Sequence, residues 1–163
     1  MNLESANIIL RTSSVALGSD KDSNRTNITW RNINLKMALG SLYDKYTKFK
    51  ICLTSVGNAN TSNIANITDR MLNINMTGLM WINQTYDTST NSNTNNVIIS
   101  TAIFNSTSGF SINYTGEIGW VFQKPVSNNV DINIYFTRIS DGTQASGINY
   151  GETVFCFSIY GIE

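Results

Sequence analysis

The sequence predicts an all-β protein with the architecture of a single eight-stranded jelly-roll sandwich. About eight short segments are rich in apolar residues, and only one stretch has helical spacing. The connections between these segments are often longer than hairpin turns, which favours chain paths that cross between two sheets. An immunoglobulin-like sandwich is the alternative, but no tryptophan lies midway between the two cysteines, Cys52 and Cys156.

The length of 163 residues suits one domain, so we expect a single jelly-roll domain over residues 1–163. The segment 1–24 contains a first strand at 4–10 and a polar loop. It is a candidate for an extended N-terminal arm that reaches a neighbouring subunit.

The first half of the chain contains four expected strands, at 4–10, 26–33, 46–56 and 71–83. In the third, Phe49, Ile51 and Leu53 alternate with lysines and polar residues, which predicts one buried face. In the fourth, alternation continues up to Gly78, which marks a bulge or bend. Between the second and third strands, Asn34 can cap a short helix that Gly40 interrupts, so we expect one short helical turn near residues 34–43.

The second half begins with a low-complexity polar segment at 84–96, which we expect to be an exposed loop. The stretch 97–104 (VIISTAIF) is almost continuously apolar and suits a strand buried on both faces. Further strands are expected at 110–114, 117–123, 130–139 and 152–160. The segment 130–139 alternates clearly, with Ile132, Ile134 and Phe136 facing inward and Tyr135 outward.

The composition offers little for catalysis. Histidine is absent, so Ser-His-Asp and Cys-His sites are impossible, and two distant cysteines supply too few ligands for the usual zinc sites. No phosphate-binding or dinucleotide glycine motif occurs. We therefore expect no enzyme, no catalytic residue, no metal and no cofactor. A small hydrolase with paired carboxylates is the remaining enzymatic alternative. The cysteines leave two interpretations open, reduced thiols or a disulfide between neighbouring strands.

Charge and hydropathy exclude two classes of partner. The formal net charge is zero, whereas a nucleic-acid binder needs a basic face. No apolar run approaches the roughly 20 residues that span a bilayer. A neutral surface of this kind permits close association with copies of the same chain.

Aromatic residues are the candidates for recognition. Trp81, Tyr86, Tyr114 and Tyr150 lie in or beside expected loops, where aromatic faces can stack on a sugar ring or insert into a partner. The alternative is that they cap the ends of the sandwich. Tyr135, on the outward face of its strand, is the candidate for a side chain that is buried only on assembly.

Several motifs carry a family resemblance: TWRNINL at 29–35, Leu39-Gly40, YDKY at 43–46, FKICL at 49–53, and a terminal pattern of Phe155, Phe157 and Tyr160. Together they resemble single jelly-roll capsid proteins of large double-stranded DNA viruses, such as vertex pentons and minor capsid components. The resemblance implies a structural role in the virion and homo-oligomerisation as a pentamer or trimer, with other capsid proteins as partners. A lectin-like or fibre-head module that binds a glycan or receptor shares this fold and is the alternative.

Overall fold

The computed structural model describes residues 4–59, 69–82, 85–87, 92–94, 96–104, 110–113, 119–145 and 149–163, with the backbone alone at 85–87, 92–94 and 110–113. The first half of the chain contains β1 (Ser5–Arg11), the short 3-10 helix η1 (Thr12–Ser14), β2 (Asn27–Asn34), α1 (Leu35–Leu39), α2 (Ser41–Lys45), β3 (Lys48–Ala59), β4 (Met71–Thr77) and β5 (Met80–Trp81). The second half contains β6 (Thr85–Asp87), β7 (Ser92–Thr94), β8 (Val97–Ile103), β9 (Phe110–Asn113), β10 (Trp120–Gln123), β11 (Asn129–Arg138) and β12 (Glu152–Ile162).

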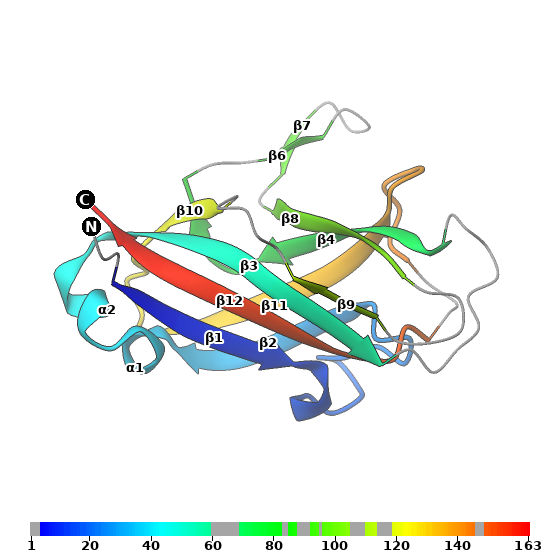
Figure 1. The fold of residues 1–163 in the computed structure, drawn as a ribbon, viewed down its shortest axis with the longest axis horizontal. Helices are drawn as coiled ribbons and strands as arrows, with labels where there is room; N and C mark the ends of the chain where they lie inside the picture. Colours follow the sequence, from blue (N-terminus) through cyan, green and yellow to red (C-terminus); the bar gives the residue numbers. More distant parts are fainter. Residues whose placement is uncertain are drawn as a thin grey trace.

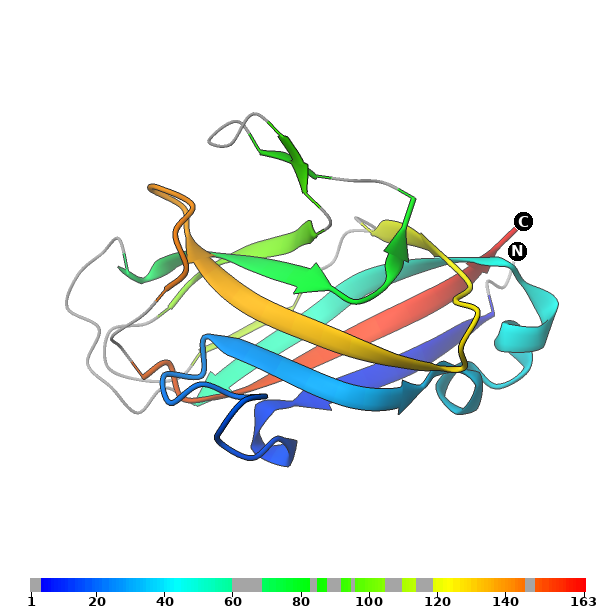
Figure 2. The ribbon, with the colours of Figure 1, turned by 180° about the vertical axis from the view of Figure 1, so that it is seen from behind.

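The strands form two stacked antiparallel sheets. Sheet A has the order β1-β12-β3-β10-β5, with β9 also paired to β3, and it lies in front in Figure 1. Sheet B has the order β2-β11-β4-β8 and lies in front in Figure 2. The β6–β7 hairpin projects away from both sheets, and the two helices close one end of the sandwich (Figure 1). This arrangement confirms the predicted all-β sandwich.

The strand order is that of a jelly roll. Strands β9 and β10 pair with two successive parts of β3, so they are two segments of one interrupted strand. If β9 and β10 are counted as one strand and β5 as an added edge segment, the chain has eight strand positions, numbered in sequence order. In these numbers sheet A has the order 1-8-3-6 and sheet B the order 2-7-4-5. Every connection except that from the fourth to the fifth position therefore crosses from one sheet to the other, as the long predicted connections favoured.

Side chains from the inner faces of both sheets form the core. Phe49, Ile51 and Leu53 are buried, as their alternation predicted. At the other end of the sandwich, the ring of Phe104 lies 5.4 Å from that of Phe136 and 5.1 Å from that of Tyr150, centroid to centroid, in edge-to-face contacts.

The predicted helical turn is present as two single-turn helices. The Asn34 side chain accepts a hydrogen bond from the Met37 N–H at 2.9 Å and caps α1. Gly40 separates α1 from α2 with a φ of +56°, a conformation that suits glycine. Leu35 and Leu42 are buried beneath the two turns and close this end of the core.

Three expectations about the strands need correction. The segment 71–83 is not one strand: it breaks at Gly78 (φ +99°), so that β4 lies in sheet B and β5 in sheet A. The segment 84–96 is not only loop, because it contains the β6–β7 hairpin. Strand β8 is not buried on both faces, since Ile103 is 61% exposed on this edge strand.

The N-terminal segment also differs from the expected arm. Strand β1 pairs with β12 along its whole length, from Ser5 opposite Tyr160 to Arg11 opposite Val154. The described residues 4–24 therefore belong to the sandwich of their own chain. Cys52 and Cys156 are both reduced thiols outside any disulfide, Cys52 being buried and Cys156 half-buried. No helix among the described residues has the length and apolarity needed to cross a membrane.

Candidate functional site

The open edges of the two sheets lie together on one side of the sandwich, formed by β1, β2 and the loop between them. We call this side the β1–β2 flank. An open groove of about 530 Å³ runs along it, lined among others by Ile9, Leu10, Val15, Trp30 and Ile33. Trp30 forms part of the floor and donates its indole N–H to the Arg11 carbonyl at 3.0 Å, so it links the two sheet edges. The groove is mainly apolar and therefore suits contact with an apolar surface.

An ion-pair group forms one rim of this groove. The Arg31 guanidinium lies 2.7 Å from an Asp20 carboxylate oxygen and 3.1 Å from one of Asp131. The hydrogen bond from Arg31 lowers the pKa of Asp20 despite the small opposing effect of desolvation. The Asp20 carbonyl also accepts the N–H of Thr29 at 2.7 Å, so the loop before β2 covers the first half of that strand's edge.

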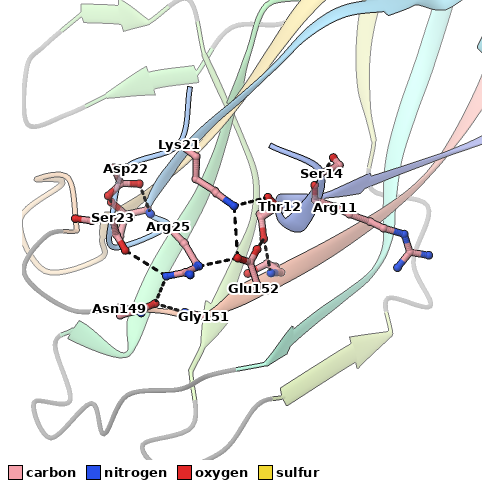
Figure 3. Close-up of polar contacts among 12 residues, drawn as sticks. Arg11, Thr12, Ser14, Lys21, Asp22, Ser23, Arg25, Asn149, Gly151 and Glu152 are labelled. Carbon is pink, nitrogen blue, oxygen red and sulfur yellow. Dashed lines mark hydrogen bonds and ion pairs between the residues drawn. The ribbon is translucent and has the colours of Figure 1, made fainter. Parts of the chain in front are cut away.

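A second polar cluster anchors the N-terminal loop to the start of β12 (Figure 3). The Glu152 carboxylate accepts hydrogen bonds from Arg25 Nε at 2.8 Å and from Lys21 Nζ at 3.4 Å, and a further one from the Thr12 hydroxyl. Lys21 Nζ also donates to the Thr12 carbonyl at 2.8 Å, and its side chain is only 6% exposed. Arg25 continues the network to the Asn149 side-chain oxygen at 2.9 Å.

The charges in this anchor cluster are unbalanced, because one carboxylate faces two cations. Burial by itself would raise the pKa of Glu152, but the hydrogen bonds from Arg25 and Thr12 and the charge of Lys21 lower the pKa overall. Since Lys21 is buried and Glu152 is its ion-pair partner, the cluster needs an ionised Glu152. The arrangement holds the loop of the β1–β2 flank in place.

The outer face of sheet B is an amide-rich surface centred on Tyr135. The Asn96 amide donates to the Tyr135 hydroxyl at 2.7 Å and to the Asn75 side-chain oxygen at 3.1 Å. The Asn133 amide donates to the side-chain oxygens of Asn27 at 2.6 Å and Thr29 at 3.0 Å. We call this surface the amide face. Its amides and hydroxyls can exchange hydrogen bonds with a polar ligand.

An apolar row lies at one end of the same outer face. Met71 pairs with Ile103 across β4 and β8, and Ile139 donates its N–H to the Met71 carbonyl at 3.1 Å. All three side chains are exposed to solvent: Met71 by 37%, Ile103 by 61% and Ile139 by 42%. Three neighbouring apolar side chains on an outer sheet face form a second candidate contact surface, separate from the β1–β2 flank.

The three aromatic candidates whose side chains the structure describes, Trp81, Tyr135 and Tyr150, lie in separate places. Tyr135 is half-buried on the amide face, and the outward orientation predicted for it is confirmed. Trp81 is half-buried in β5 with its ring centroid 6.1 Å from that of Phe122, so it packs against the core. Tyr86 lies in β6, where the backbone alone is described, and Tyr114 lies outside the described residues.

Tyr150 corrects the prediction of an exposed loop aromatic. It is fully buried, and its hydroxyl donates to the Asp69 carbonyl at 2.6 Å. Burial raises its pKa to about 12. This residue thus follows the alternative interpretation, in which a loop aromatic caps the end of the sandwich, and it is closed to a ligand.

The β1–β2 flank was not among the surfaces predicted from the sequence, because only aromatic residues were taken as recognition candidates. The available signal was the alternation in ANIIL, which places Ile9 on the opposite face from Ile8 and Leu10. In the described part of the chain, no group of three or more Cys, Asp or Glu residues is arranged to hold a metal ion. The described surfaces are suited to contacts with other molecules.

Comparisons with known proteins give limited likeness. No family model matches the chain, and no curated protein matches it. Among solved structures, the chain is similar to one from the empty head of turnip yellow mosaic virus. The identity is 10%, the match covers 99% of this chain and 82% of that chain, and the TM-score is 0.27. The assignment of the fold depends on the strand order and register of this chain itself.

Proposed function

We propose that this protein is a non-enzymatic structural subunit of a virion shell. In this role it is a single jelly roll of the penton-like or minor capsid type, and it assembles with copies of itself and with other capsid proteins. One observation carries the proposal: a neutral jelly roll has two separate apolar contact surfaces, the β1–β2 flank and the apolar row.

Two separate surfaces matter because they set what kind of assembly is possible. A simple dimer needs one self-complementary surface, whereas a ring or shell needs each subunit to contact at least two neighbours. The flank lies at the edges β1 and β2, and the apolar row lies across β4 and β8 at the other edge of sheet B. With a formal net charge of zero, copies of the chain do not repel each other over long range.

The oligomeric state of the purified protein tests this proposal. Native mass spectrometry and light scattering over a concentration series should detect oligomers larger than a dimer. Ile103→Lys places a charge in the apolar row and should reduce the larger species, while Val126→Lys, at a fully exposed site away from both surfaces, should not. A wild-type protein that stays monomeric at high concentration contradicts the proposal.

The amide face supports a second candidate, a module that binds a glycan. Tyr135 with the half-buried Asn96 and Asn133 amides combines an aromatic ring with hydrogen-bonding groups, the combination that sugars require. A glycan array distinguishes the two functions. Specific binding that Tyr135→Ala abolishes, in a protein that remains monomeric, favours the binding module.

A further inference from the structure

Strand β1 has a backbone edge that faces solvent. Its neighbour β12 lies on one side only, and the Arg11 carbonyl accepts a hydrogen bond from the Trp30 side chain on the other side. Backbone groups alternate in direction along an antiparallel strand, so the N–H and C=O groups of Asn7 and Ile9 point the same way as those of Arg11. They face away from β12.

The register of sheet A leads independently to the same result. Lys124 donates its N–H to the Thr47 carbonyl, so alternate residues of β3, including Phe49, turn their backbone groups towards β10. The intervening Lys50 therefore bonds to its partner Tyr160 on β12. Because backbone groups alternate along β12, the β12 residues paired with Ala6, Ile8 and Leu10 turn their N–H and C=O groups towards β1. Asn7 and Ile9 are left with outward-facing backbone groups.

Helix α1 contacts β1, but no backbone group in the described part of the chain bonds to the outward N–H and C=O groups of Asn7 and Ile9. Asn7 is exposed, and the Ile9 side chain is 53% exposed. The other edges of the sheets differ: Asp20 covers part of β2, β5 is only two residues long, and the pairing of β8 with β4 contains a bulge. Proteins commonly protect an edge strand with lysines, prolines or bulges, and β1 has none of these. An unprotected edge of this kind can accept another strand.

We propose that β1 pairs edge to edge with β1 of a second copy, antiparallel and about a two-fold axis, so that sheet A continues from one subunit into the next. Only registers that oppose outward-facing residues can form the hydrogen bonds. The register centred on Ile8 places Asn7 opposite Ile9 of the other copy, so that these residues exchange backbone hydrogen bonds. It places Arg11, whose carbonyl already accepts from Trp30 and Ser14, opposite Ser5. A shift by one residue would oppose an outward-facing residue with an inward-facing one.

Charge complementarity selects a second copy in this orientation. Strand β1 has Arg11 at its C-terminal end, and Glu4 precedes its N-terminal end. Antiparallel pairing brings each Arg11 close to Glu4 of the other copy, whereas parallel pairing would place the two Arg11 side chains side by side. The two exposed Ile9 side chains become diagonal neighbours across the axis and cover each other. This contact rests on the proposed self-assembly and specifies one of its interfaces.

A proline substitution tests the contact directly. Asn7→Pro removes an N–H that faces solvent in the monomer, and proline is tolerated on an edge strand. The matched control is Asn7→Ala, which loses the hydrogen bond from Ser158 Oγ at 2.9 Å but keeps the backbone N–H. In sedimentation velocity experiments, Asn7→Pro should weaken self-association at least about tenfold relative to Asn7→Ala, since the interface loses two hydrogen bonds. Circular dichroism checks that both variants are folded.

A charge exchange provides a second test that does not alter the backbone. Arg11→Glu and Glu4→Arg should each weaken association about threefold or more, and the double variant should restore it. The lost ion pair between Glu4 and Lys45 is exposed, so folding should be little affected. Oligomers that survive Asn7→Pro unchanged, with no restoration in the double variant, overturn the β1 contact but not the shell function. A β1-dependent dimer that never grows supports the contact and overturns the shell function, and a monomeric wild type overturns both.

Discussion

Replacing Glu152 by glutamine tests the anchor cluster, because glutamine keeps the shape of the side chain and removes its charge. In the native protein the carboxylate lies 2.8 Å from Arg25 Nε and 3.4 Å from Lys21 Nζ. The Lys21 side chain is 6% exposed and has one other partner, the Thr12 carbonyl. Glu152→Gln therefore leaves a buried ammonium group without its counter-charge.

The stability that Glu152→Gln is expected to remove lies between the values for a fully buried and for an exposed ion pair. Removing one partner of a fully buried ion pair costs about 3–5 kcal/mol, whereas an exposed pair contributes about 0–1 kcal/mol. Glu152 is 37% exposed, so solvent screens part of the interaction. We therefore expect Glu152→Gln to lower the free energy of unfolding by about 2 kcal/mol. For a chain of 163 residues this corresponds to a fall in Tm of about 4–8 °C.

Urea denaturation of four proteins measures this effect: the wild type, Glu152→Gln, Lys21→Met and the double variant. Methionine replaces the ammonium by an apolar group of similar length, so it removes the buried charge. The double variant should be more stable than the sum of the single losses predicts, with a coupling of about 1 kcal/mol or more. If Glu152→Gln lowers the free energy of unfolding by less than about 0.5 kcal/mol and the coupling with Lys21→Met is zero, the reasoning is refuted.

The same carboxylate predicts the direction of an acid effect. The pKa of Glu152 in the folded protein lies below its ordinary value of 4.5. Its stabilising contribution is therefore present above about pH 4.5 and is lost as the pH falls through the folded-state pKa. Thermal unfolding between pH 6 and pH 3 should show a smaller acid-induced loss in Glu152→Gln than in the wild type.

Three further variants test the core and the sheet switch by urea denaturation. Gly78→Ala should destabilise the protein by about 3 kcal/mol or prevent folding, since φ is +99° and a Cβ there would overlap the Asp131 carbonyl oxygen; wild-type stability would contradict this. Phe136→Ala should cost about 3–5 kcal/mol because the side chain is fully buried; a loss below about 1 kcal/mol would be too small for a core position. Tyr150→Phe should cost about 1–2 kcal/mol by leaving the Asp69 carbonyl unpaired. It should also flatten the loss of stability between pH 10 and about pH 12, because the pKa of Tyr150 is raised to about 12.

The sequence predicted the inward faces of the strands well because alternation is a local property. Leu72, Ile74 and Met76 alternate with polar residues and are fully buried, and Phe49 and Ile51 behave in the same way. The helical turn was equally local: an Asn cap, leucines at helical spacing and one glycine defined it. These elements were predictable because neighbouring residues alone decide them.

The misplaced elements depend on contacts between distant residues. Ile103 was expected inside because apolar composition does not distinguish a central strand from an edge strand, and β8 is an edge. For Tyr150 the sequence left two interpretations open, recognition at a loop or capping of the sandwich end, because its position beside a loop fits both. Its burial depends on Phe104, which lies far away in the chain. Gly78 was recognised as a bend, but the change of sheet follows from its approach to β11.

The candidate site was the least predictable part. Alternation along ANIIL is enough to place Ile9 on the outer face, but whether β1 has a free edge depends on which strands pair with it. The amide face was foreseen only through Tyr135, because the hydrogen bonds among Asn75, Asn96 and Asn133 join three separate segments. Surfaces made by neighbouring strands become visible only when the strand order is known.

The position of the last two long strands also decides when the protein can fold during its synthesis. Strand β11 lies between β2 and β4 in one sheet, and β12 lies between β1 and β3 in the other. A nascent chain that ends before residue 129 therefore lacks the middle of both layers: β1 and β2 have no neighbouring strand, and β3 and β4 are paired on one side only. The sandwich cannot be completed until β12 leaves the ribosome. Until then the unpaired apolar strands are prone to aggregation.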